Sequence, residues 1–153
     1  MTAPLLDVRD LRVTFQLRRA SDMPWTKPLL LHAVNGVNFH ILPGETLGIV
    51  GESGCGKSTL ARALIQMVPA TGKAIWREKT DLLALSSREM LRYRSDIQMV
   101  FQDPLASLNP RMTVGQIIAE PLKTHRRGIR PDEVKLKVKA MMDRVGLLPN
   151  QIN

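Results

Sequence analysis

The sequence contains one cysteine, Cys55, among its 153 residues. A single thiol excludes an internal disulfide and any cysteine-based metal cluster, and it fits a reducing compartment such as the cytoplasm. The three histidines, His32, His40 and His125, lack the spacing of metal ligands, so we interpret them as ordinary surface or half-buried residues. These residue types therefore give no indication of a metal site.

Long apolar runs are also missing. No stretch approaches the roughly 18 to 20 apolar residues that cross a bilayer, and the N-terminus lacks a basic region followed by an apolar core. We therefore expect a soluble chain that is not secreted. With 44% hydrophobic and 24% charged residues, the composition is that of one globular domain with room for an appended subdomain.

Aromatic residues are scarce, at 4%, and the net charge is +8. A basic chain suggests nucleic acid or an anionic membrane as a partner. The densest basic stretch, residues 123–139, interleaves no aromatic residue and matches none of the usual nucleic-acid modules. We therefore expect no nucleic-acid partner.

The helix predicted at the end of this stretch, over residues 132–145, is amphipathic. Lys135, Lys137 and Lys139 lie away from the apolar face, and we interpret them as a solvated face; docking to a membrane-bound partner near anionic lipid is the alternative. The apolar face comprises Val134, Val138, Met141, Met142 and Val145.

The sequence does contain a phosphate loop. Residues 51–59 read Gly-Glu-Ser-Gly-Cys-Gly-Lys-Ser-Thr, which matches G-x-x-x-x-G-K-[ST], and they lie between a predicted strand at 46–50 and a predicted helix at 59–67. Glycines let successive backbone N–H groups approach phosphate oxygens, and the positive end of the helix adds to the field there. The motif therefore predicts binding of ATP or GTP.

Each residue of the loop is a predicted cofactor-binding residue. Lys57 is expected to reach the β- and γ-phosphates, and the Ser58 hydroxyl is expected to bind Mg²⁺. The full predicted set in the loop is Gly51, Glu52, Ser53, Gly54, Cys55, Gly56, Lys57, Ser58 and Thr59.

Periodicity and turn chemistry predict the remaining elements. Besides 46–50, strands are expected at 8–17, 29–41, 73–76 and 97–101, with an extended loop at 18–28. Capping-box spacing predicts helices that begin after Ser86 and after Thr113, the second of which should stop near Pro121. Pro131 is well placed to begin the last helix, and Gly146 to follow its end. The pattern predicts a mixed β and α/β core to about residue 102, followed by helices.

Gln102 directly follows the predicted strand at 97–101. Ligands of open α/β sheets bind at the carboxyl ends of strands, where an amide can offer its carbonyl to Mg²⁺ or hold an attacking water. A glutamine after a strand is also a common polar loop residue. The residues around Gln102 are therefore needed to distinguish a ligand of Mg²⁺ or water from an ordinary loop residue.

Residues 101–113 read Phe-Gln-Asp-Pro-Leu-Ala-Ser-Leu-Asn-Pro-Arg-Met-Thr. This segment resembles the glutamine loop of ABC-transporter ATPases, in the form used by oligopeptide and dipeptide importers. Together with residues 48–59 and 94–98, it makes the chain similar to the second ATP-binding subunit of a bacterial oligopeptide permease, from about residue 5 to the end.

The resemblance implies a fold and an organisation. The fold class is α/β, a P-loop NTPase core of the ABC ATPase type with an N-terminal antiparallel β subdomain and the start of a helical subdomain. Residues 1–102 would hold the β subdomain and the nucleotide-binding core. Residues 103–153 would hold the glutamine loop and the first part of the helical subdomain.

The resemblance also implies roles for individual residues. ATP and Mg²⁺ are the expected cofactors, Ser58 and Gln102 the expected metal ligands, and Lys57 and Gln102 the expected catalytic residues. An aromatic residue near the end of the first strand stacks on adenine in such ATPases, and Phe15 is the best match. Phe15 also shares a predicted core stripe with Leu11 and Val13, and Trp25 is its rival.

Cys55 has two interpretations. A thiol beside a helix N-terminus and a lysine can have enhanced reactivity. The alternative is a small residue that fills a variable position of the motif.

The expected partners are those of an inner-membrane importer. They are two membrane-spanning permease subunits, a sister ATPase subunit and, indirectly, an extracytoplasmic peptide-binding protein. The chain itself would be peripheral, on the cytoplasmic face of the inner membrane.

Three later motifs of the family are absent from the sequence: the Leu-Ser-Gly-Gly-Gln-type signature, an apolar strand ending in Asp-Glu, and a switch histidine. Asp132 and Glu133 follow Pro131 at a helix start, so they cannot be that strand-end pair. We therefore expect an incomplete domain, truncated before the signature, with weak MgATP binding and negligible turnover.

Two other functions stay open at this point. One is a soluble phosphate-loop NTPase that acts on nucleic acid, which the basic charge suggests and salt-sensitive DNA binding would favour. The other is a non-catalytic fragment that only binds nucleotide or a partner.

Overall fold

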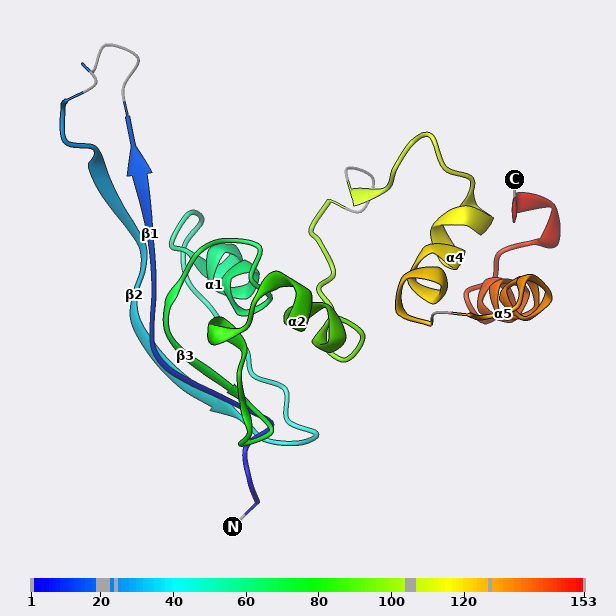
Figure 1. The fold of residues 1–153 in the computed structure, drawn as a ribbon, viewed down its shortest axis with the longest axis horizontal. Coiled ribbons are helices and arrows are strands. Elements are labelled where there is room, and N and C mark those ends of the chain that lie inside the picture. Colours follow the sequence, from blue (N-terminus) through cyan, green and yellow to red (C-terminus); the bar gives the residue numbers. More distant parts are fainter. Residues whose placement is uncertain (1, 19–22, 24, 104–106, 127, 153) are drawn as a thin grey trace. The chain divides into compact units, whose positions relative to one another are not determined.

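The structure is a computed structural model that describes residues 2–18, 23, 25–103, 107–126 and 128–152 (Figure 1). The chain forms two compact units, residues 1–98 and residues 99–153, and each is described by itself. The division lies close to the boundary predicted after residue 102. Part of the predicted loop at 18–28 falls outside the described residues.

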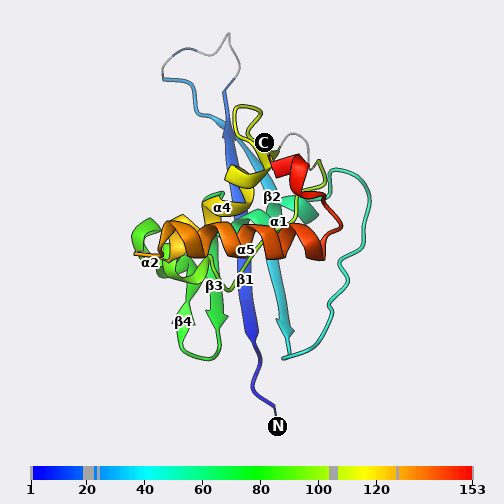
Figure 2. The same cartoon turned by 90° about the vertical axis from the view of Figure 1, so that its right-hand side faces the viewer.

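The first unit contains an antiparallel sheet with the strand order β2-β1-β3-β4, which Figure 2 shows side by side. The two long strands predicted from the sequence are confirmed, and the strand predicted at 73–76 begins two residues earlier. The strands are β1 (Leu6–Leu17), β2 (Leu29–Ile41), β3 (Thr71–Trp76) and β4 (Thr80–Asp81).

A bulge in β1 sets which side chains enter the core. The register of β1 with β2 shifts between Val8 and Leu11, and Asp10 has a φ of 46°. The extra residue brings Val8 to the same side as Leu11 and Val13, although strict alternation would place it opposite them. All three are buried, and they pack with side chains of the helices that follow.

In the described part of the first unit, three short helices follow: α1 (Lys57–Leu64), the 3₁₀ helix η1 (Leu82–Ala84) and α2 (Ser87–Tyr93). The predicted capping box is confirmed, because the Ser86 hydroxyl accepts from the Glu89 amide while the Glu89 carboxylate accepts from the Ser86 amide. Buried α1 residues Leu60 and Ala63 and buried Met90 of α2 belong to the same core as β1. The helix predicted at 59–67 is therefore present, with an earlier start and end.

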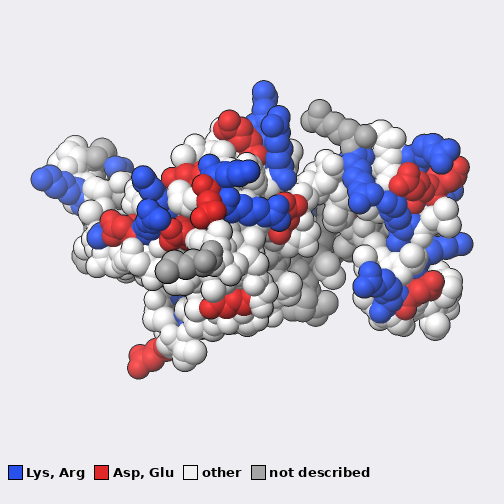
Figure 3. All heavy atoms as spheres, turned by 90° about the horizontal axis from the view of Figure 1, so that it is seen from below, with Lys and Arg blue, Asp and Glu red and all other residues white. Residues whose placement is uncertain are grey.

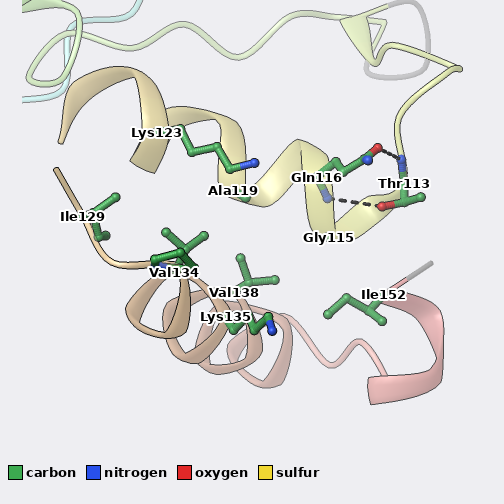
Figure 4. Close-up of a pocket in the computed structure, with 11 residues that line it drawn as sticks. Thr113, Gly115, Gln116, Ala119, Lys123, Ile129, Val134, Lys135, Val138 and Ile152 are labelled. Atoms are coloured by element: carbon green, nitrogen blue, oxygen red, sulfur yellow. Dashed lines mark hydrogen bonds between the residues drawn. The ribbon is translucent and has the colours of Figure 1, made fainter. Parts of the chain in front are cut away.

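The second unit contains α4 (Val114–His125), α5 (Pro131–Arg144) and the 3₁₀ helix η2 (Pro149–Ile152). The second predicted capping box is confirmed between Thr113 and Gln116. Ala119 of α4 faces Val134 and Val138 of α5 across a hollow of about 560 Å³, with Lys123 and Lys135 among its lining residues (Figure 4).

One prediction for the helical unit is wrong. Pro121 lies inside α4, which continues to His125, because a proline removes one hydrogen bond and the flanking turns hold the helix through it. On α5, Val134, Val138 and Met142 are buried as expected, whereas Met141 and Val145 are 46% and 62% exposed. At 100° per residue Met141 lies at the edge of the apolar stripe, and Val145 is the C-cap, beyond the last residue of α5.

The strands predicted at 46–50 and 97–101 are also wrong: both segments are irregular in the structure. Val50 is 96% exposed and Val100 is 94% exposed. A strand exists only when a neighbour accepts its backbone hydrogen bonds, and neither segment has a sheet partner among the described residues. An apolar run indicates a preference for burial, but it does not show that a neighbouring strand is present to pair with it.

Candidate nucleotide-binding site

The phosphate loop takes its shape from two glycines in the left-handed region. Gly54 has a φ of 80°, and Gly56 has a φ of 100°. A Cβ on Gly56 would lie 2.2 Å from the carbonyl oxygen of Ala33 in β2, which is backbone and cannot move aside. Glycine at position 56 therefore lets the loop pass against β2 where any other residue would collide.

The loop leads directly into α1, whose N-terminus is available to an anion. Gly56 is the N-cap and has no side chain to accept from the first turn, and that turn holds no acidic residue. The first amides of a helix lack intrahelical partners, and the helix dipole makes this end positive. The loop and the start of α1 thus form the kind of backbone cradle that binds phosphate.

Lys57 places a positive charge across this loop. Its Nζ donates to the carbonyl oxygens of Gly51 and Glu52, at 2.8 and 2.6 Å, and lies 3.5 Å from the Sγ of Cys55. The ammonium is therefore held by the backbone of the loop. Its side chain is half-buried, so the charge keeps access to solvent and to a ligand.

A hollow of about 390 Å³ lies between the loop and β2. From the loop side it is lined by Cys55, Gly56 and Lys57, and from β2 by residues that include His32 and Asn35. The Nδ1 of His32 is 3.0 Å from the Thr14 hydroxyl of β1, which fixes the orientation of the ring. Sequence reasoning passed over His32, because the motif spacing does not reveal which part of β2 faces the loop.

The other predicted site residues are distributed as follows. Ser58 and Thr59 begin α1 beside the loop, with Ser58 exposed. Phe15 is half-buried and packs against the core, and it is not among the residues that line the hollow; Trp25 is 79% exposed. Gln102 is exposed and belongs to the second unit. The adenine-stacking role of Phe15 and the pairing of Gln102 with Ser58 remain predictions.

Basic and acidic side chains are interspersed on the face seen in Figure 3. Most of the described ion pairs are local, such as Arg9 with Asp7 and Lys137 with Glu133. A continuous basic stripe of the kind that follows a nucleic-acid backbone is not visible in that view.

Comparison with known proteins identifies the family. The sequence pattern of ABC transporters matches residues 34–152. The chain belongs to the ABC transporter family. The expected ABC ATPase fold is confirmed by the dimeric structure of MJ0796, a bacterial ABC transporter cassette, which superposes with a TM-score of 0.76 at 23% identity, over 97% of this chain and 60% of that one.

Curated relatives are oligopeptide and glutathione transport proteins. The chain is 56% identical over 150 residues to the oligopeptide transport ATP-binding protein OppF of Salmonella typhimurium, across 97% of this chain and 45% of the relative. OppF of Escherichia coli K12 is 55% identical with the same coverage. The glutathione import ATP-binding protein GsiA of Escherichia coli O6:H1 is 45% identical over 147 residues, or 95% of this chain and 23% of the relative.

The chain thus spans less than half the length of these relatives. None of them supports the alternative of an NTPase that acts on nucleic acid. Within the described part of the chain, no helix is long and apolar enough to span a bilayer.

Proposed function

We propose that residues 51–59 bind the phosphates of ATP, and that the chain is the nucleotide-binding part of an ATPase subunit that drives an oligopeptide importer. The observation that carries the proposal is the phosphate loop itself. Gly56 is forced against Ala33, the amides of α1 are open, and the Lys57 ammonium is held across the loop. Three independent features thus favour the same ligand, a polyphosphate anion.

The residues at the start of α1 also fit Mg²⁺. The exposed hydroxyl of Ser58 stands at the start of α1, beside the loop that would hold the phosphates. No group of three or more histidine, cysteine or acidic side chains gathers among the described residues in a way that could hold a metal. The ion would therefore be held by phosphate oxygens, water and Ser58, with Gln102 as the second proposed protein ligand, which is the coordination Mg²⁺ favours.

In the proposed reaction, water attacks the terminal phosphorus of ATP, and ADP and inorganic phosphate are released. Magnesium, held by Ser58 and Gln102, would supply positive charge to neutralise the phosphate oxygens. Lys57 stabilises the negative charge that develops on the β- and γ-phosphates, and the amides at the start of α1 hold the nucleotide in place. Gln102 would orient the attacking water.

The chain by itself should turn over very slowly. Asp132 and Glu133 lie in the first turn of α5, so they are not a strand-end pair that could hold Mg²⁺ and activate water. ABC ATPases bind nucleotide between the phosphate loop of one subunit and the signature of another, and this chain carries only the loop. In this proposal residues 1–153 supply the phosphate-loop side of the nucleotide site.

The names of the relatives support the assignment to peptide import, since two of them are oligopeptide transport proteins. Membrane-spanning permease subunits and a sister ATPase would be the direct partners, at the cytoplasmic face of the inner membrane. A peptide-binding protein would be an indirect one. Glutathione is the rival solute, because GsiA carries that name.

Calorimetric titration with MgATP tests the proposed site. Replacing Lys57 with alanine removes hydrogen bonds from a charged donor, so the affinity should fall about 10- to 100-fold. Lys73→Ala, which removes an exposed lysine of β3 outside the loop, is the matched control and should bind as the parent chain does. Equal affinities for the Lys57→Ala and Lys73→Ala variants would contradict the proposal. ATP hydrolysis by the chain alone above about one turnover per second that Lys57→Ala abolishes would contradict the expected slow turnover, but not the binding of phosphate by the loop.

A further inference from the structure

The β1–β2 ribbon extends beyond the rest of the sheet. Strand β3 pairs with β1 only from Leu6 to Arg12. From Val13 onward, β1 pairs only with β2 among the described residues, with Phe15 opposite Leu31 and Leu17 opposite Leu29. Val13 is buried and Phe15 packs against the core, whereas Leu17 and Leu29 to Leu31 are exposed. Beyond Phe15 the ribbon therefore lies outside the core. We call residues 17, 18, 23, 25, 27 and 29–31 the ribbon end.

The ribbon end is unusually apolar for an exposed segment. Consecutive residues of β2 point to opposite faces, yet three successive leucines are present there. Trp25 is 79% exposed, the largest value among its apolar residues. The other exposed apolar side chains are Leu17 at 45%, Met23 at 58%, Leu29 at 61%, Leu30 at 51% and Leu31 at 49%. Six exposed apolar side chains at one end of a hairpin are more than the scattered single ones of an ordinary surface, and such a concentration is typical of an interaction site.

Charge and residue type indicate the partner. Segment 16–32 carries three basic residues, Arg18, Arg19 and Lys27, and one acidic residue, Asp22. Leucine and tryptophan flanked by lysine and arginine is the composition of segments that lie in the interface of an anionic bilayer. A second copy of the chain is disfavoured, because two basic ribbon ends would face each other.

We propose that the ribbon end inserts its apolar side chains into the interface of an anionic phospholipid membrane, with Arg18 and Lys27 near the lipid phosphates. The contact is made by the chain itself and requires no bound nucleotide. It goes beyond the proposed function, because an ATPase subunit can reach a membrane through its permease subunits alone.

The two tryptophans allow a direct test. Trp76 belongs to β3 and packs against the core, whereas Trp25 lies in the ribbon end. In the Trp76→Phe variant Trp25 is the sole reporter, and in the Trp25→Phe variant Trp76 is. With vesicles of phosphatidylglycerol and phosphatidylcholine that carry brominated acyl chains, Trp25 emission should shift to the blue and be quenched. Trp76 emission should change little. Vesicles of phosphatidylcholine alone should have little effect on either tryptophan.

Matched substitutions distinguish membrane binding through the ribbon end from non-specific binding of the chain to vesicles. Arg18→Gln with Lys27→Gln should weaken binding to the anionic vesicles about twenty-five-fold, from about fivefold for each charge. Lys135→Gln with Lys139→Gln removes the same charge from exposed positions of α5 and should bind as the parent chain does. Leu29→Ser should weaken binding about tenfold. Leu148→Ser, at an equally exposed leucine, should not.

Several outcomes would overturn the proposal. One is Trp25 emission that the brominated lipid leaves unchanged. Another is equal quenching of both tryptophans, which would indicate general partitioning or unfolding on the vesicle. A third is equal loss of binding in the two charge variants. A blue shift of Trp25 that grows with protein concentration in the absence of lipid would instead assign the ribbon end to self-association. Because no nucleotide is added, none of these results bears on ATP binding.

Discussion

Replacing Gly56 with alanine tests how the phosphate loop is held. The residue has a φ of 100°, and an alanine Cβ would lie 2.2 Å from the Ala33 carbonyl oxygen. A side chain in the left-handed region costs about 1–2 kcal/mol, and crowding against fixed backbone adds about 1–3 kcal/mol. The free energy of unfolding should therefore fall by about 2–5 kcal/mol in total.

Gly54→Ala is the matched control. Gly54 also has a positive φ, of 80°, but a Cβ there would meet nothing within 4 Å. Only the conformational cost applies, so the free energy of unfolding should fall by about 1–2 kcal/mol. The difference between the two variants isolates the contact of the loop with β2.

The assay is urea unfolding followed by circular dichroism, with MgATP affinity measured on the folded variants. Gly56→Ala should weaken ATP binding more than Gly54→Ala, because relief of the clash has to move the loop or the N-terminus of α1. If both variants lose the same stability and the same affinity, the close approach to Ala33 does not position the loop, and the reasoning fails.

Three further predictions concern single residues. Cys55 should be alkylated readily and MgATP should protect it, since its thiol lies beside Lys57 in the loop; equal labelling rates with and without MgATP would remove the idea. Hydrogen bonds from Ser86 hold the pKa of Glu89 below its ordinary value of 4.5, so its stabilisation is complete above that value and is lost as the pH falls through the lowered one. Urea midpoints at pH 6 and pH 3 should therefore differ less in Glu89→Gln than in the parent chain. Pro121→Ala restores a backbone donor inside α4 and should raise the stability of the second unit by about 1–3 kcal/mol; no gain would mean that the missing hydrogen bond at Pro121 does not weaken α4.

The features that the sequence predicted well depend on neighbours within a few residues. The two capping boxes, Pro131 at the first turn of α5 and Gly146 with a φ of 74° each follow from local backbone geometry. The alternation of β1 also predicted Leu11 and Val13 in the core. The bulge at Asp10 was beyond that argument, because nothing in the alternation marks an extra residue.

The features that the sequence predicted poorly depend on distant partners. Pairing of residues 46–50 or 97–101 needs a neighbouring strand, and apolar character alone cannot specify it. The candidate site also combines features set by nearby residues with features set by distant ones. The motif spacing located the loop at residues 51–59, whereas His32 enters the hollow only because β2 runs beside the loop. Its position beside the loop could not be predicted from spacing along the chain.

The irregular segment before the loop indicates which end of the loop holds it in place. A phosphate loop stands between a strand and a helix, and in this chain only the helix is formed, since residues 46–50 are exposed and unpaired among the described residues. The loop is instead fixed from its other end. Leu60 and Ala63 anchor α1 in the core, and Gly56 rests against Ala33. The amides at the start of α1 belong to this anchored end, so at least this part of the proposed phosphate cradle is positioned by the core.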